Sequence, residues 1–134
     1  MLERDYLTRL FAVLAAAIRR SIFMEKNDPR GAADTLEEAI SAATDIDGAI
    51  LLSLAPESMS SVLQVSGVDP KVCGYIAHTL LLESQYLEEA KDEGLAGLRR
   101  QQAEAIAEAY GVDLDTSEAE IDDLVNRHGD DEVD

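Results

Sequence analysis

The feature that most constrains this fold is the set of residues that start and stop helices. Asp28-Pro29 and Asp69-Pro70 each place an Asp at a helix N-cap and a proline at the first helical position, and Ala55-Pro56 offers a third start with a poorer cap. Gly67 and Gly111 stand where helices should stop. No segment alternates apolar and polar residues over a sustained length, so we expect no strand. The chain is therefore predicted to be all-α.

Apolar periodicity between these signals divides the chain into helices. We predict helices over about residues 3–24, 29–44, 46–53, 56–65, 70–92, 95–110 and 117–127. Gly94 is expected to make the turn between two long helices, and Ser117 with Glu120 is typical of a capping box. The expected fold is one compact bundle of six to seven paired antiparallel helices. Residues 1–112 should form the helical domain, and residues 113–134 a short C-terminal helix with an acidic, frayed tail.

The charge of the chain is acidic and uneven. The net charge is −17 over 134 residues, of which 46% are hydrophobic, enough for one buried core. Such a charge repels nucleic acid and anionic membranes and attracts basic partners. Residues 1–30 hold six Lys or Arg and four Asp or Glu, so the N-terminal helix is the one segment that is not acidic. Either this helix packs inside an acidic shell, or its arginines form a recognition surface.

Cysteine usage and hydropathy indicate the compartment. Cys73 is the only cysteine, which excludes a secreted scaffold held by internal disulfides. Arg9, Arg19 and Arg20 interrupt the N-terminal apolar stretch, so it does not resemble a signal peptide. The chain has no run of about 18 uncharged apolar residues that would suggest a membrane span. We expect a cytoplasmic protein.

The first predicted helix carries apolar residues over an unusually wide arc. At about 100° per residue, its apolar positions spread over roughly 220° of the helix surface. An ordinary surface helix buries a narrower stripe. The helix should therefore be covered on both sides, either as the central helix of the domain or by a second copy or a partner. We predict an interaction surface at Tyr6, Leu10, Val13 and Ala17.

Glu83 is the one acidic residue near the middle of a broad apolar face, on the helix predicted over residues 70–92. A carboxylate there is costly unless it is paired or hydrogen-bonded. We predict that Glu83 is partly buried, with an Arg, Tyr or backbone partner. One interpretation is a structural bond to Arg4, Arg19 or Tyr6. The other is a ligand contact inside a groove.

Paired helices raise the question of a repeat. Ala32, Leu36 and Ala39 match the A-x3-F-x2-A pattern of the second helix of a tetratricopeptide repeat, with Leu in the aromatic position. The later helix pair keeps its two small positions, but Arg100 stands where a bulky apolar residue belongs. Both pairs lack the W-x2-L-G-x2-Y signature. The pattern favours two degenerate tetratricopeptide-like hairpins over a true tandem array.

The arrangement resembles a family of small helical proteins from mostly anaerobic Gram-positive bacteria, catalogued as a domain of unknown function and thought to be repeat-like. The residues that carry the resemblance are Arg4-Asp5-Tyr6 with Arg9, the hairpin positions Ala32, Leu36, Glu37 and Ala39, the run Leu51-Leu52-Ser53-Leu54, and Ala77 to Leu82 with Glu83. The likeness covers roughly residues 2–110, and the chain departs from it after Val112. The resemblance implies a helical fold and a bacterial, cytoplasmic origin. It implies no activity and no functional residue.

The sequence carries no motif for catalysis or metal binding. A calcium loop starting at Asp113 would need Gly and Glu where Glu118 and Leu124 stand. The one cysteine and two histidines give no zinc spacing. Cys73 and His78 are five residues apart on one predicted helix, about 140° around it, so they cannot form a nucleophile and base within that helix. We expect a buried Cys73, a boundary His78, no enzyme activity, no cofactor and no metal.

These observations favour a non-catalytic interaction or self-assembly module, with a protein partner or a second copy and no nucleic acid or membrane. A first alternative is a small-molecule sensor with a pocket between the first and fifth helices, where Glu83 would fix a cationic ligand. A second is an acidic mimic that binds basic proteins. The sequence does not identify the partner.

Overall fold

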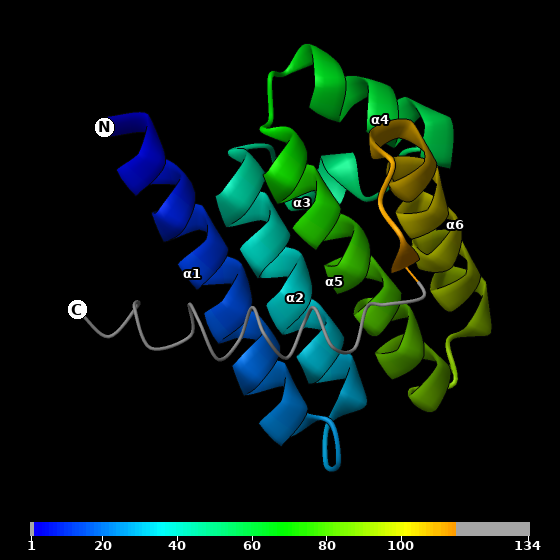
Figure 1. The fold of residues 1–134 in the computed structure, drawn as a ribbon. Coiled ribbons are helices and arrows are strands. Elements are labelled where there is room, and N and C mark those ends of the chain that lie inside the picture. The colour runs from blue at the N-terminus through cyan, green and yellow to red at the C-terminus, as the bar shows by residue number, and fades with distance from the viewer. Residues whose placement is uncertain (1, 115–134) are drawn as a thin grey trace.

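The computed structural model describes residues 2–114, and these form a compact bundle of helices (Figure 1). The helices are α1 (Leu2–Met24), α2 (Pro29–Thr44), α3 (Gly48–Leu51), α4 (Pro56–Val65), α5 (Pro70–Glu89) and α6 (Glu93–Tyr110). No strand occurs within residues 2–114, which confirms the predicted all-α class. The helix predicted over residues 117–127, with its capping box, lies outside the described residues. None of the described helices is both long and apolar enough to cross a bilayer.

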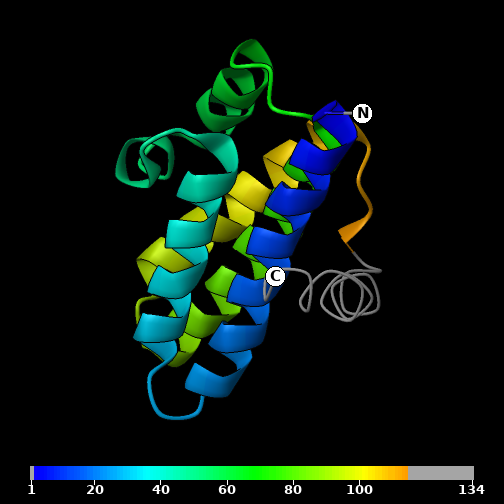
Figure 2. The same cartoon turned by 90° about the vertical axis from the view of Figure 1, so that its left-hand side faces the viewer.

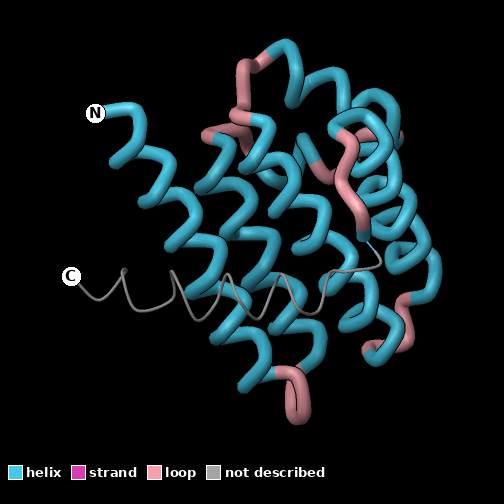
Figure 3. The backbone as a smooth tube through the Cα atoms, viewed as in Figure 1, coloured by secondary structure: helices cyan, strands magenta, loops and turns pink. Residues whose placement is uncertain are grey.

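The four long helices pack in two antiparallel pairs. Successive long helices run in opposite directions, α1 with α2 and α5 with α6 (Figure 1), and short loops join the elements (Figure 3). α5 packs against α6 and α2, and less extensively against α1. α1 lies beside α2 at one edge of the bundle, and α4 packs on α6 (Figure 2). α5 is therefore the central helix, and the expectation that the first helix could be central is wrong.

The helix starts and stops follow local chemistry. The Asp28 carboxylate accepts a hydrogen bond from the Gly31 backbone N–H at 2.9 Å, and Asp69 accepts one from the Lys71 N–H at 2.8 Å. Ala55 makes no side-chain cap, as its residue type requires. Gly67 and Gly111 have φ values of 76° and 69°, in the left-handed region that glycine enters most easily. The predicted helix boundaries at Asp28, Asp69, Gly67 and Gly111 are confirmed.

The turn between α5 and α6 differs from the prediction at Gly94. The residue with positive φ is Lys91, at 67°, and the Asp92 carboxylate accepts from the Leu95 N–H at 3.3 Å to cap α6. Gly94 lies inside the first turn of α6. Arg30 of α2 donates to Asp92 at 2.9 Å, which ties this cap to the α1–α2 hairpin. A good N-cap thus starts the helix before the glycine, whose flexibility is tolerated in the first turn.

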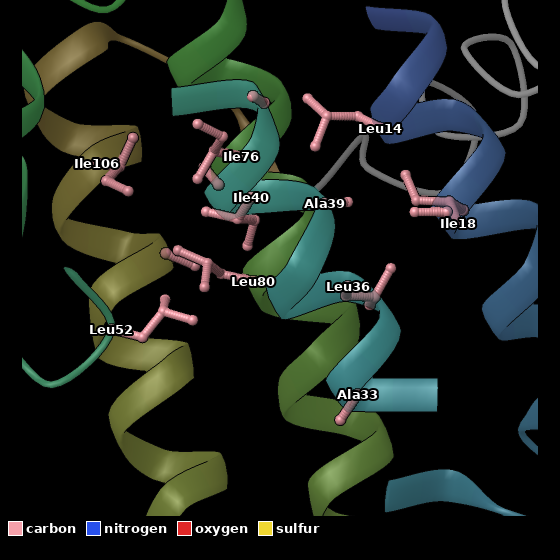
Figure 4. Packing of buried hydrophobic residues seen from close by; sticks show 14 of the residues in the cluster. Leu14, Ile18, Ala33, Leu36, Ala39, Ile40, Leu52, Ile76, Leu80 and Ile106 are labelled. Carbon is pink, nitrogen blue, oxygen red and sulfur yellow. The ribbon is translucent and has the colours of Figure 1, made fainter. Parts of the chain in front are cut away.

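The core forms where α1, α2, α5 and α6 meet. Leu14 and Ile18 of α1 lie toward Leu36 of α2, and Ile76 and Leu80 of α5 fill the space between α2 and α6 (Figure 4). The small tetratricopeptide-like positions of α2 are buried, as packing positions should be. In α6, Arg100 is exposed, whereas the neighbouring Arg99 is buried. The described fold therefore confirms paired helices and leaves the repeat relationship a prediction.

The middle of α1 is covered within the single chain. Every side chain from Ala12 to Ile18 is buried or half-buried. Seven successive helical residues point in every direction around the axis, so this stretch needs no second copy to cover it. The exposed large apolar side chains of α1 lie nearer its two ends, at Tyr6, Ile22 and Phe23.

Candidate functional site

The predicted interaction surface on α1 is only partly accessible. Tyr6 is 56% exposed, whereas Leu10 and Val13 are half-buried and pack against the core. Ala17 is fully buried and belongs to the core cluster, so its inclusion in a contact surface is wrong. The apolar arc of α1 is too wide to be an external face, because much of it packs inside the bundle. Among the four residues, the accessible one is Tyr6, and the turn of α1 around it carries the exposed residues Thr8 and Arg9.

A groove opens beside this turn, with a volume of about 580 Å³. One wall consists of Tyr6, Leu7 and Leu10 of α1, and the others of residues 43–46 at the end of α2 and residues 66–70 between α4 and α5. These segments meet at the end of the bundle where α1 begins (Figure 1). We call this cavity the α1 groove. Two of the four residues in the predicted surface line it.

The lining of the α1 groove mixes apolar side chains with polar groups, and two of its residues are acidic. Ile46 and Val68 are half-buried and pack against the core, while Asp45 and Asp69 add two carboxylates. Both carboxylates stand at helix ends. The Asp45 backbone N–H donates to the Ser41 carbonyl at 3.0 Å in a left-handed C-cap, and Asp69 caps α5. Because helix caps hold these segments, the groove is preformed rather than dependent on loop movement.

Glu83 lies in the interior, as predicted, but its partner is on another helix. The side chain is fully buried, and its Oε2 accepts from the Nε of Arg99 of α6 at 2.7 Å. The prediction of a buried acid with an Arg partner is confirmed. The partner is Arg99 of α6 and not Arg19 or Tyr6, so those two suggestions are wrong, while the Arg4 side chain lies outside the described part of the chain. Glu83 also does not line the α1 groove, so the structure does not place it where a ligand in that groove could reach it.

Arg99 extends this bond into a polar network that joins four parts of the fold. Its guanidinium donates to the Leu52 carbonyl at 2.8 Å, to Gln102 Oε1 at 3.1 Å and to Glu37 Oε2 of α2 at 3.2 Å. Gln102 Nε2 donates to the carbonyls of Leu52 and Leu54 at 3.0 and 2.9 Å. We call Glu37, Glu83, Arg99 and Gln102 the polar network. It fastens the α3–α4 link to α2, α5 and α6.

Sequence reasoning missed Arg99 and Gln102, although a signal was present. Both residues lie on the buried face of α6 together with Ala96, Ala103 and Ile106. A polar pair three residues apart inside an apolar helical stripe indicates a buried hydrogen-bonding group, because an unsatisfied one would be costly there.

Cys73 and His78 both lie in the interior of α5. Cys73 is fully buried, as predicted, and burial raises the pKa of its thiol, which makes it a poor nucleophile. His78 is also buried, so its prediction as a boundary residue is wrong. Burial and the neighbouring Cys73 raise the pKa of Tyr110 to about 12. A cavity of about 390 Å³ adjoins His78 and Tyr110, lined also by Lys71 and Tyr75.

Acidic side chains gather in a separate shallow hollow of about 370 Å³. Asp34, Glu37, Glu38 and Asp47 line it. Burial and the neighbouring Glu37 raise the pKa of Asp34. Within residues 2–114, no three His, Cys, Asp or Glu side chains are arranged to hold a metal ion. The hollow is therefore a region of negative potential that the polar network reaches through Glu37.

Comparisons of the chain with protein-family models, with curated proteins and with solved structures find no match. The resemblance to the bacterial helical family accordingly stays a prediction.

Proposed function

We propose that the protein is a non-catalytic interaction module that binds a segment of another protein in the α1 groove. The occupant is an apolar side chain flanked by Lys or Arg. The observation that carries this proposal is a preformed groove of about 580 Å³ with an exposed tyrosine in its wall. Tyrosine supplies a large contact area at low entropic cost, which is why it is common among residues that dominate binding.

Charge favours a basic partner over a second copy. The chain has a net charge of −17, so two copies repel each other, while a basic segment is attracted. Asp45 and Asp69 put carboxylates in the groove itself, within reach of flanking basic residues. The middle of α1 is already covered within one chain, which removes the argument for a dimer through that helix. We further propose a cytoplasmic setting, since the fold has a single buried cysteine.

A peptide titration with matched variants tests this proposal. The probe is a fluorescent peptide with a central leucine between lysines, and the readout is anisotropy. Tyr6→Lys should weaken binding about fivefold or more, since losing an aromatic contact that dominates binding costs over about 1 kcal/mol. Asp45→Asn keeps a residue that tolerates the left-handed backbone and should weaken binding less, with a smaller salt dependence.

Phe23→Lys is the control for Tyr6→Lys. Phe23 is 80% exposed on the same helix, roughly 25 Å along the axis from Tyr6. Its substitution should leave the affinity unchanged. Equal losses in both variants would contradict a specific groove. If the binding were abolished by salt and unaffected by Tyr6→Lys, the protein would act as an acidic mimic instead. Concentration-dependent dimers lost in Tyr6→Lys would assign the groove to self-assembly.

A further inference from the structure

The polar network brings two carboxyl groups to one guanidinium. Arg99 donates to Glu83 at 2.7 Å and to Glu37 at 3.2 Å. The Glu83 side chain is fully buried, and that of Glu37 is 29% exposed. If both carboxyls were ionised, the network would carry an uncompensated negative charge in the protein interior. Such a charge is costly where water is excluded.

Hydrogen-bond accounting at Glu83 indicates where a proton is needed. Its Oε2 accepts from Arg99. No group among the described residues donates a hydrogen bond to its buried Oε1. Glu83 and Glu37 bind the same guanidinium, through its Nε and Nη2 atoms, which holds the two carboxyls close together, and a hydrogen bond with Glu37 is among the influences that raise the pKa of Glu83. Two carboxylates have no hydrogen between them, so this bond exists only when one of them is protonated.

We propose that Glu83 and Glu37 share one proton, held on Glu83, and that its release loosens the attachment of the α3–α4 link. In the protonated state Glu83 donates to Glu37 and still accepts from Arg99. The positive charge of Arg99 is then balanced by a single negative charge, that of Glu37, and the guanidinium also donates to the Leu52 carbonyl. Deprotonation adds a second negative charge and removes the donor, so both glutamates compete for Arg99. Glu37 reaches the acidic hollow and provides the route by which the proton leaves.

The electrostatic surroundings of Glu83 agree with this assignment. Burial is the largest cause that raises the pKa of Glu83 well above 4.5, and the hydrogen bond and charge of Glu37 raise it further. Arg99 acts in the opposite direction. The charged groups that face Glu83 are thus Glu37 from α2 and Arg99 from α6, and the described part of α1 adds none. The influences that raise the pKa of Glu83 outweigh the lowering effect of Arg99.

The sign of the pH dependence follows. Below the ordinary glutamate pKa of about 4.5, Glu83 is protonated in both the folded and unfolded chains. Above it the unfolded chain releases the proton and the folded chain keeps it, so stability falls with rising pH until the raised folded pKa is passed. Within that window the unfolding equilibrium constant should gain about tenfold per pH unit from this one group.

The test compares urea unfolding of the full chain across pH with that of Glu83→Gln. Glutamine is isosteric with the protonated acid: its amide donates to Glu37, and its carbonyl accepts from Arg99. The variant should match the wild type at low pH and become more stable than the wild type as pH rises. Within the window, the ratio of their unfolding equilibrium constants should change about tenfold per pH unit. Glu38→Gln, an exposed neighbour of Glu37, should keep the wild-type profile. Parallel profiles for wild type and Glu83→Gln would overturn the proposal.

A second measurement needs no variant. In the wild type, the carboxyl ¹³C shift of Glu83 should titrate well above the ordinary glutamate pKa of about 4.5. Amide exchange at Ser53 and Leu54, corrected for the intrinsic rate, should accelerate through the same transition, because the network holds the carbonyls on either side. A Glu83 carboxyl that titrates near the ordinary pKa of about 4.5 would show that the buried group is an ordinary ionised acid and that no shared proton exists.

Discussion

Arg99→Met is expected to lower the free energy of unfolding by about 3 to 5 kcal/mol, measured by urea denaturation near neutral pH. The substitution keeps much of the side-chain volume and removes every guanidinium donor. Gln102 Oε1 loses its donor, the Leu52 carbonyl keeps only the bond from Gln102 Nε2, and the Glu37–Glu83 pair loses its cation. Buried groups without partners carry the full cost of leaving water, which makes this the most damaging single polar change.

Arg100→Met is the matched control for Arg99→Met. The adjacent arginine is half exposed, and it forms an ion pair with Glu88 at 3.4 Å on the surface. Exposed pairs of this kind contribute little, so the change should stay within about 0.5 kcal/mol. Comparable losses for the two variants would mean that the polar network adds nothing beyond surface electrostatics.

Leu36→Ala is expected to cost about 2 to 5 kcal/mol, with no change in the denaturant slope if the fold is kept. Leu36 is fully buried on the face of α2 that meets α1, close to Ile18 (Figure 4). Its removal leaves a cavity where two alanines of α2 already allow close helix approach, so the neighbours have little freedom to close it.

Ile50→Ala provides the comparison for Leu36→Ala. It removes a similar amount of apolar side chain from α3, where Ile50 is 62% exposed. The expected change in the free energy of unfolding is within about 0.5 kcal/mol. An equal loss at both positions would contradict the assignment of the core to the α1–α2–α5 contact.

Helix boundaries could be predicted where the signal is local. Asp28 and Asp69 bond backbone groups two or three residues away, and glycine alone enters the left-handed region without strain, so these ends follow from the sequence. The turn after α5 could not be predicted, because Lys91 has no sequence feature that marks it as left-handed. The Asp92 cap and its bond to Arg30 fix that turn through contacts with a distant helix.

In the candidate sites, too, the sequence predicts the local features but not those that depend on how the helices pack. Helix periodicity places Glu83 on an apolar face, which predicts burial. It does not predict Arg99 as the partner, because that pairing depends on the register in which α6 packs on α5. Likewise the apolar arc of α1 predicts that Tyr6 and Ala17 are both contact positions. Only the packing of α1 at the edge of the bundle shows that one is exposed and the other is core.

Mapping of the lysine-flanked leucine peptide by ¹H–¹⁵N correlation spectra of the wild-type protein tests the central claim most directly. The account predicts saturable shift changes confined to the walls of the α1 groove, in residues 6–10, 43–46 and 66–70. A peptide with alanine in place of leucine should produce much smaller changes. Changes centred on Ile22 and Phe23, or no saturable change at all, would contradict the assignment of the α1 groove as the binding site.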